Sequence, residues 1–365
     1  MSSSRGKLDF IAQFERDRGW FGRSGDDTDV VISSRVRIAR NIAAFPFPAA
    51  MSDEQQAEFE GTIVPVLSSV CDSGEYRIVE LDSADSNERG RLRERNLIST
   101  PDGDARPYLA LFPEDEALSV TVNSRDHLRI AAIRSGRGLH DAWNTVRKCE
   151  KAFASHLRFA VNIEFGYLTR EVENCGTGMR ASALLHLPGL VATQQLSGTL
   201  ENLLKDRFRL KSFSLARENE ISDAFPFSHV YQLSDRYSLG RDEEDQLGEL
   251  EYTVGELVQF ERSGREEMLK QYGSTVSRSL DRAMEALMSA TELSAGYAIS
   301  QLLAVRFGVS CGYISSLDPV TLTSLLFVVQ KCHILAIADA NDEKVDVVRA
   351  NLVRQILSSK LKHRG

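Results

Sequence analysis

The chain has 365 residues, of which 42% are hydrophobic and 26% charged, and its 44 basic and 52 acidic side chains give a formal net charge of −8. This composition excludes a mainly disordered chain, the length suggests two domains, and the negative charge argues against nucleic acid as a partner. No apolar run approaches the roughly 20 residues needed to cross a bilayer and the start, MSSSRGKLDF, has no apolar signal core, so we expect a cytoplasmic protein without membrane contact.

The first two-thirds of the chain predict a sheet with flanking helices. The polar start predicts a flexible N-terminus over residues 1–25, which leads as a loop into VVISSRVRIARNI. Ser52 is predicted to cap a helix that carries Glu54 in its first turn. Short segments rich in β-forming residues then follow: EYRIVEL, LSVTVN, FAVNIEFGYLT, RLKSFSLA and HVYQLSDRYSL. They show no regular βαβ spacing, which favours an α+β domain with a mainly antiparallel sheet over residues 26–245.

The last third predicts helices only. Apolar residues recur at helical spacing from Leu247 to Val258 and again from Leu280 to Met288. Asp318 is a predicted helix cap with Pro319 at the first helical position, and KVDVVRANLVRQIL is a final amphipathic stretch. We therefore predict a small all-helical domain over residues 246–365, with the boundary between Gly240 and Gly255.

The cysteines and histidines do not predict a metal site or a disulfide. The cysteines are odd in number, scattered and in no CxxC pair: Cys71, Cys149, Cys175, Cys311 and Cys332. His127, His186 and His333 lie far apart and show no HExxH spacing. We expect no structural metal.

Five arginines stand where simple structure would not require them. Arg35 and Arg37 lie in SSRVRIARN, Arg129 in DHLR, Arg180 in GTGMRAS and Arg217 in FSLAR. A guanidinium inside an apolar run usually has an ion-pair partner or an anionic ligand, because its fork of donors matches carboxylate and phosphate oxygens. Each one alone is better explained as a solvated or salt-bridged side chain, so only the set is informative.

The set and its surroundings resemble the phosphagen kinase superfamily, most closely the bacterial protein-arginine kinases, from about Trp20 to Arg349. The matching motifs are DVVISSRVRIARN, VNSRDHLRI with SGRGL, NCGTGMRASALLHLPGLVATQQL and VYQLSDRYSLG. The resemblance implies transfer of the ATP γ-phosphoryl group to a guanidinium nitrogen, with magnesium carried by ATP. It assigns nucleotide binding to the five arginines and to Ser33, Ser34, Ala181 and Ser182.

The same resemblance exposes what this chain lacks. The family's NEEDH motif reads Asn123-Ser124-Arg125-Asp126-His127, without the two glutamates. The loop after the last arginine reads RENEIS, with Ser222 in place of a glutamate. Glu171 replaces a substrate-side cysteine, and Asn96 replaces a histidine. A guanidinium acceptor needs carboxylates to orient it and take its proton. Arg125 in this position would repel the acceptor guanidinium. It would reverse the sign of an interaction between the two groups worth about 4 kcal/mol at 4 Å under an effective dielectric of 20.

Two functional hypotheses follow. In the first, catalysis is lost or severely impaired while the phosphate clamp remains, and the protein acts by binding or regulating partners. In the second, it is an active protein-arginine kinase in which Glu171 serves as a relocated carboxylate, assisted by Asp126 or Glu220. Taken singly, Glu171 and Glu220 are better explained as solvated loop acids, and Asp126 as the partner of a neighbouring arginine.

The C-terminal region carries a partial match to the family's phosphoarginine-docking motif, Arg-Asp-x-x-Arg-Ala. Here Asp346 and Arg349 are present, but Val345 replaces the leading arginine. An amphipathic helix with one exposed acid and one base explains them equally well. The resemblance further implies arginine-containing or phosphoarginine protein partners, a zinc-containing activator protein, a link to Clp-type proteolysis and a homodimer formed through the helical domain.

A dinucleotide-binding loop is the remaining alternative. Gly176, Gly178 and Ala181 satisfy GxGxxG/A, but Arg170 to Asn174 stand between them and the preceding strand-like segment. No GxxxxGK[ST] P-loop occurs in the chain. We therefore rank an oxidoreductase far behind.

Overall fold

The computed structural model describes residues 9–71, 76–99, 109–196, 198, 207–215, 227–338 and 344–362. Its described strands form an eight-stranded sheet in the order β2-β3-β4-β5-β1-β8-β10-β9, in which every neighbouring pair is antiparallel. The strands are β1 (Val31–Arg40), β2 (Tyr76–Glu80), β3 (Leu109–Pro113), β4 (Leu118–Val122), β5 (Leu128–Ser135), β8 (Met179–His186), β9 (Phe208–Ser212) and β10 (Val230–Asp235). The predicted α+β class with an antiparallel sheet is confirmed.

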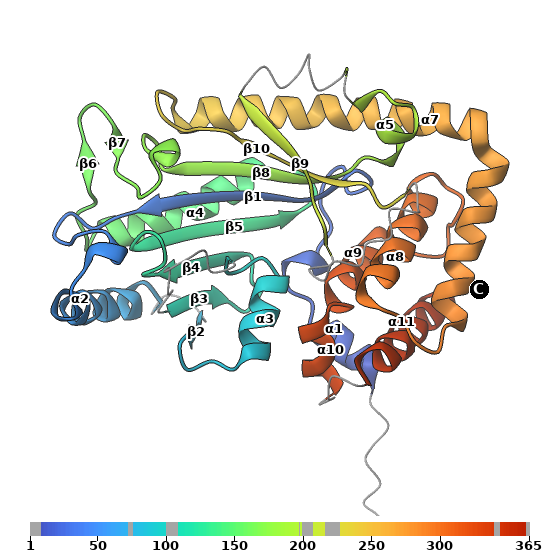
Figure 1. Ribbon diagram of the computed structural model, residues 1–365, viewed down its shortest axis with the longest axis horizontal. Helices are drawn as coiled ribbons and strands as arrows, with labels where there is room; N and C mark the ends of the chain where they lie inside the picture. Colours follow the sequence, from blue (N-terminus) through green and yellow to red (C-terminus); the bar gives the residue numbers. More distant parts are fainter. Residues whose placement is uncertain are drawn as a thin grey trace, which may run out of the picture.

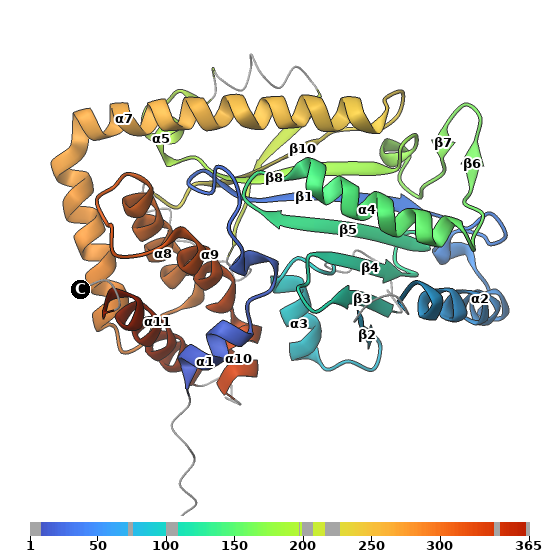
Figure 2. The ribbon, with the colours of Figure 1, turned by 180° about the vertical axis from the view of Figure 1, so that it is seen from behind.

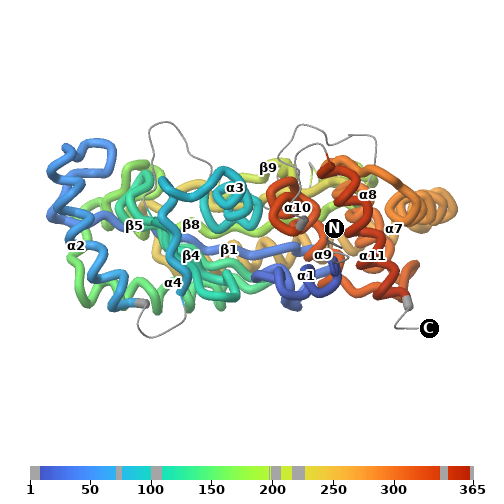
Figure 3. Tube along the Cα trace, turned by 90° about the horizontal axis from the view of Figure 1, so that it is seen from below, coloured from blue at the N-terminus to red at the C-terminus, as the bar shows by residue number. Residues whose placement is uncertain are grey.

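Helices cover one face of this sheet and extend beyond its end (Figures 1 and 2). In Figure 2, α4 lies in front of the central strands, which Figure 1 shows directly from the other side. The helices are α1 (Phe10–Arg16), α2 (Asp53–Cys71), α3 (Ser86–Glu94), α4 (Leu139–Ala154), α5 (Pro188–Ala192), α7 (Glu243–Ser289), α8 (Ala295–Ser310), α9 (Pro319–Val328), α10 (Lys331–Ala338) and α11 (Val345–Lys362). The later helices α8 to α11 pack together at one end of the molecule, and α2 lies at the other (Figure 3).

The strands alternate between two cores because successive side chains of a strand point to opposite faces. Val36 and Ile38 of β1 belong to the core that includes α4 and the first part of α7. Ile32 of β1 and Ile133 of β5 belong to the core that includes the C-terminal helices. Ile32 faces away from Val36, although the two lie four residues apart, because a β-bulge between Val31 and Ser33 shifts the register. The side chains of β1 that point away from α4 therefore lie on the open face of the sheet.

The predicted helix starts are confirmed where the structure describes them. The Ser52 hydroxyl accepts a hydrogen bond from the backbone N–H of Gln55 at 3.3 Å, and α2 begins at Asp53. Asp318 accepts from the N–H of Thr321 at 2.8 Å, with Pro319 as the first residue of α9. In both cases a side-chain oxygen satisfies a backbone donor that the first turn of a helix leaves free.

Two segments differ from the sequence-based expectation. The segment FAVNIEFGYLT adds no strand to the main sheet but forms a separate hairpin of β6 (Val161–Asn162) and β7 (Gly166–Tyr167). The Asn162 side chain accepts from the N–H groups of Glu164 and Phe165 and so closes a turn there. Within the predicted flexible N-terminus, residues 9–25 contain α1 and bury aromatic side chains, which are Phe10, Phe14, Trp20 and Phe21. These aromatics join the core of the C-terminal helices, since burying them is strongly favourable.

Helix α7 joins the sheet to the C-terminal helices. It runs through residue 245, where the sequence analysis places the domain boundary, and has one non-helical residue, Tyr272, at its kink. The two predicted domains therefore share a helix at that point. Among the described helices, none alone is long and apolar enough to cross a membrane, although α9 with α10 would pass on length and composition as a pair bent by 91°.

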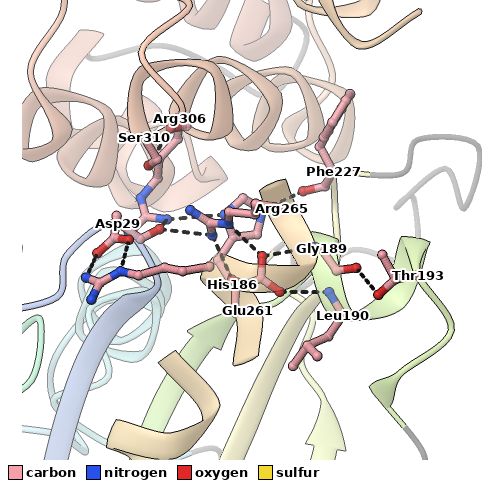
Figure 4. A network of polar contacts seen from close by, with 11 residues as sticks. Asp29, His186, Gly189, Leu190, Thr193, Phe227, Glu261, Arg265, Arg306 and Ser310 are labelled. Atoms are coloured by element: carbon pink, nitrogen blue, oxygen red, sulfur yellow. Dashed lines mark hydrogen bonds and ion pairs between the residues drawn. The ribbon is translucent and has the colours of Figure 1, made fainter. Parts of the chain in front are cut away.

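A buried polar network fixes α7 and α8 to the end of β8 and to the loop before β1 (Figure 4). Glu261 of α7 is fully buried, and its carboxylate accepts from Arg265 at 2.6 Å and from the backbone N–H groups of Gly189 and Leu190 at 2.9 Å. These contacts tie α7 directly to the start of α5.

A second part of the network reaches α8. Arg306 donates to the Asp29 carbonyl at 3.2 Å and to His186 Nδ1 at 3.2 Å, while His186 Nε2 donates to the Phe227 carbonyl at 2.6 Å. Burial, and then the charge of Arg306, holds the pKa of His186 well below its ordinary value. The imidazole is therefore neutral, and the network positions three separate segments of the chain against one another.

Candidate functional site

A row of polar and cationic side chains crosses four adjacent strands on the open face of the sheet. The backbone register pairs Arg35 of β1 with Ser182 of β8, Ser182 with Ser234 of β10, and Ser234 with Arg209 of β9. Directly paired residues of antiparallel strands point to the same face. All four side chains therefore share one face.

Neighbouring positions add further positive charge to this row. Arg37 pairs with Arg180 two residues along β1, and Lys211 pairs with Gln232 on the other side of the row. Together the side chains line a cavity of about 240 Å³, whose lining residues are Arg35, Arg37, Arg180, Ser182, Arg209, Lys211, Gln232 and Ser234. Five of these eight side chains are cations, and none is a carboxylate. Among the described residues, this cavity is a site built for an anion.

The cations destabilise one another in the absence of a ligand. Burial, and then the charge of Arg129, lowers the pKa of Arg35 to about 9. Burial, and then Arg180, lowers the pKa of Arg129 to about 10, and the pKa of Arg180 is lowered by burial and by Arg209. Each shift has the same cause, which is a positive charge held partly out of water near others of the same sign. A bound anion would relieve this repulsion.

The structure brings most, but not all, of the predicted nucleotide residues together. Arg35, Arg37, Arg180 and Ser182 line the cavity, and Arg129 acts electrostatically on two of these arginines. Ser33 lies beside it in a smaller cavity of about 30 Å³, which Arg35 and Ser182 also line together with Asn96, Ile133, Leu184, Phe213 and Gln232. Arg217 lies outside the described residues, as do Glu220 and Ser222.

Ser34 and Ala181 are exceptions, because the alternation of the strands directs their side chains to the covered face. The Ser34 hydroxyl donates to the Gly136 carbonyl at 2.8 Å and accepts from the Gly138 N–H at 3.2 Å. Ala181 is fully buried in the core beneath the sheet. Their side chains support the strands and do not line the cavity, and a nucleotide contact from these two residues stays a prediction.

Sequence reasoning missed Arg209 and Lys211. Both lie in the predicted strand RLKSFSLA, at alternate positions that share a face. That spacing could have identified them as a pair. Their convergence with Arg35 depends on the position of β9 at the edge of the sheet, which local sequence does not contain.

Asp235 lies just beneath the site. Its carboxylate accepts from the Ala181 N–H at 3.0 Å and lies 3.6 Å from Arg241. Burial raises the pKa of Asp235 to about 6, although the Ala181 hydrogen bond and the nearby Arg241 and Arg180 act to lower it. The carboxylate is 1% exposed and points into the covered side, so it is not an open ligand for a bound molecule.

The predicted acceptor side is neutralised by an ion pair. Arg125 Nη1 donates to Glu171 Oε1, and Asn174 Nδ2 donates to Glu171 Oε2 at 2.7 Å. The side chains of Arg125 and Glu171 are 32% and 37% exposed. Both Glu171 oxygens thus accept a hydrogen bond. Glu171 is therefore a partly exposed acid that is also held by Arg125.

Asp126 is held by hydrogen bonds inside the protein. It is buried, and its Oδ1 accepts from the Asn41 side chain at 2.7 Å and from the Arg170 N–H at 2.9 Å. Asn41 in turn accepts from the His127 N–H at 3.0 Å. These bonds tie the turn before β5 to the end of β1. The expected side-chain pairing of Asp126 with an arginine is replaced by a bond to an arginine's backbone.

The two C-terminal residues form a pair with one another. Arg349 donates to the carboxylate of Asp346. It also donates to the carbonyl groups of Val329 and Leu293, both at 2.5 Å. Arg349 is 1% exposed, whereas Asp346 is exposed. In this arrangement the arginine joins α11 to its neighbours. Phosphoarginine docking there stays a prediction that requires Arg349 to leave these contacts.

The remaining alternatives find little support in the geometry. Gly176 and Gly178 precede β8 and the sheet is antiparallel, whereas a dinucleotide loop follows a strand of a parallel sheet. No group of three or more potential metal ligands occurs within the described part of the chain.

Two family models match most of the chain. Residues 58–264 match the family model of the C-terminal catalytic domain of ATP:guanido phosphotransferases, and residues 274–364 match that of the C-terminal domain of protein-arginine kinase McsB. The chain is 34% identical over 353 residues to a protein-arginine kinase of Moorella thermoacetica, covering 94% of this chain and 98% of that protein. It is 32% identical over 351 residues to one of Brevibacillus brevis, covering 93% and 94%.

Solved structures show the fold. A duplicated taurocyamine kinase from Schistosoma mansoni, with bound transition-state analogue components, matches with a TM-score of 0.57 and 21% identity over 73% of this chain and 40% of that one. A lombricine kinase matches with a TM-score of 0.56 and 18% identity over 68% of this chain and 70% of that one.

Proposed function

Because the chain belongs to the ATP:guanido phosphotransferase family, and within it to the protein-arginine kinases, we propose that it binds ATP through its arginines while its phosphoryl transfer is lost or severely impaired. It would then act by binding or regulating partners. The observation that carries this proposal is the contrast between a cavity lined by five cations and an acceptor side where Arg125 is bound to Glu171.

The cavity supports the first half of the proposal. Phosphoryl transfer enzymes neutralise the charge on phosphate oxygens with fixed cations. Arg35, Arg37 and Arg180 project from rigid central strands into one cavity, where they can donate several hydrogen bonds to one phosphate chain. The repulsion among them is relieved only when an anion binds, which favours a strongly anionic ligand such as ATP.

The acceptor side supports the second half. A carboxylate that accepts a proton from a guanidinium must be free to contact it. Glu171 already accepts from Arg125 and Asn174, and Asp126 is buried with its Oδ1 occupied. A substrate guanidinium would have to displace Arg125 from Glu171, and the positive charge of Arg125 would repel it. Neither Glu171 nor Asp126 is therefore a preorganised proton acceptor.

The remaining predictions form part of this proposal. Residues 26–245 are the ATP-binding domain, and residues 246–365 form a helical domain that mediates homodimerisation or phosphoarginine docking. Its partners are arginine-containing or phosphoarginine proteins and, by family resemblance, a zinc-containing activator protein. We expect this complex to form in the cytoplasm.

Two measurements test the proposal. ATP at about 100 times its dissociation constant should stabilise the protein by about 2.7 kcal/mol, and this stabilisation should disappear in Arg180→Ala. Incubation with γ-labelled ATP, magnesium and an arginine-rich protein should yield no acid-labile phosphate above background. Transfer at the rate of an active relative assayed in parallel would reject the proposal, and its loss in Glu171→Gln would establish the alternative with a relocated carboxylate.

A further inference from the structure

The cavity holds more positive charge than a magnesium-bound nucleotide requires. ATP carries roughly four negative charges near neutral pH, and a bound magnesium ion cancels about two of them. The cavity supplies five cations through Arg209 and Lys211 of β9 in addition to the arginines of β1 and β8. A ligand that already carries a metal ion leaves several of these charges uncompensated.

The described residues that line the cavity do not fit a protein-held magnesium ion, because they include no carboxylate. Magnesium prefers oxygen ligands and is usually held by one or two carboxylates together with phosphates and water. No carboxylate lines the cavity among the described residues. Nearby carboxylates of the described chain stay outside this lining. Asp235 is buried and bonded to the Ala181 N–H, Glu171 is held by Arg125, and Glu173 is an exposed side chain that acts on Arg180 from outside the lining.

The position of β9 explains how cations could take the place of a metal. Arg35 and Arg209 are separated by three steps across the sheet, through Ser182 and Ser234. Strands lie about 4.8 Å apart, so the two arginine Cα atoms are about 14 Å apart, a separation that two long side chains can close from opposite sides. Both side chains line the same cavity, with Lys211 next to Arg209 on the same face. A phosphate chain lying between them would meet positive charge along both sides.

We infer that this cavity binds nucleoside polyphosphates in their magnesium-free form, with Arg209 and Lys211 supplying the positive charge that a metal ion would otherwise bring. The inference rests on the proposed ATP binding and extends it to the ionic form of the ligand. It makes these two side chains of the edge strand β9 phosphate-binding residues.

The test is calorimetric titration of ATP into the full-length protein in the presence of EDTA and in the presence of excess magnesium. We expect ATP to bind at least tenfold more tightly in EDTA. The double variant Arg209→Gln plus Lys211→Gln should weaken binding in EDTA at least tenfold and reduce the difference between the two conditions. Arg209→Lys with Lys211 intact should retain most of the affinity, because it keeps the charge.

A matched control is available immediately before the same strand. Arg207 is exposed, pairs with Glu249 and does not line the cavity, so Arg207→Gln removes one positive charge without changing the lining. Its two dissociation constants should stay within twofold of those of the parent protein. Circular dichroism and the melting temperature should show that every variant is folded.

The possible outcomes separate this inference from the proposed function. Equal or tighter binding with magnesium, or unchanged binding in the folded double variant, would overturn the inference while leaving ATP binding intact. Absence of ATP binding under both conditions would overturn the proposed function and the inference together.

Discussion

Arg125 and Glu171, 46 residues apart in the sequence, form an ion pair at the position that the family resemblance assigns to the substrate side. The protein thus supplies its own guanidinium to the carboxylate that could have served as the relocated base. Two departures from the family pattern that look independent in the sequence compensate each other in charge. This pairing explains how Arg125 is accommodated, and under the proposed function it keeps Glu171 from acting on another molecule.

The first prediction concerns Glu171→Gln. Because both partners are about one-third exposed, the pair should contribute less than about 1 kcal/mol, so the variant should unfold in urea at nearly the same midpoint. Its labelled-phosphate signal should equal that of the parent protein, at background. A parent signal that falls to background in the variant would show that Glu171 takes part in transfer.

The second prediction concerns Arg180→Gln, which should have opposite effects with and without ligand. Burial and the nearby Arg209 lower the pKa of Arg180, so its charge destabilises the ligand-free protein. Removing it should raise the stability of the ligand-free protein by roughly 0.5–1 kcal/mol, as for other stabilising changes made at functional sites. The increase in melting temperature on adding ATP should disappear.

The control for this variant is again Arg207→Gln, which should change neither quantity by more than about 0.5 kcal/mol. A ligand-free Arg180→Gln protein that is less stable than the parent would show that Arg180 contributes more through its packing than it costs through repulsion. An ATP-induced stabilisation equal to that of the parent would remove Arg180 from the binding site.

Much of the site could be predicted because its key residues lie in two central strands. Arg35 and Arg37 share a face through simple alternation, and the motif around Arg180 supplies the neighbouring strand. The same alternation already contradicts a side-chain contact from Ser34, which the family motif had suggested. Local periodicity was therefore a better guide to side-chain direction than the extent of the matching motif.

The rest depends on contacts that sequence does not show. The cationic contribution of Arg209 arises only when β9 pairs with β10 at the edge of the sheet. The bond between Arg125 and Glu171 joins two loops across 46 residues. The Asp346 and Arg349 pair, by contrast, has i,i+3 spacing within a helix, so their mutual contact could have been expected from the sequence.

The third prediction concerns pH and Asp235. Its pKa is about 6 in the folded protein and 3.8 in the unfolded chain, so the folded state binds more protons between these values. Stability due to this group is therefore greatest below about pH 4 and falls as the pH rises to about 6, by at most about 3 kcal/mol. Asp235→Asn should remove this loss and stabilise the protein at pH 7 by about 1–3 kcal/mol.

Urea unfolding at pH 4.5 and pH 7 measures this effect as the difference between variant and parent. The exposed Glu244 offers a control, since Glu244→Gln should leave the pH dependence unchanged. Parallel pH profiles for the parent and Asp235→Asn would show that Arg241 and the Ala181 N–H compensate the burial of this carboxylate fully.

The fourth prediction concerns Glu261, which joins α7 to the start of α5. Its two oxygens accept from the backbone N–H groups of Gly189 and Leu190 and from Arg265, and the side chain is fully buried. In Glu261→Gln, one acceptor oxygen becomes an NH₂ group that faces a donor, and Arg265 loses its charge partner near Arg306. Breaking a buried ion pair in this way should cost about 3–5 kcal/mol in the free energy of unfolding, measured by urea denaturation. Glu266 is exposed on the same helix, so Glu266→Gln should cost less than about 0.5 kcal/mol. A similar small cost for both variants would mean that packing of apolar side chains alone holds α7 against the sheet.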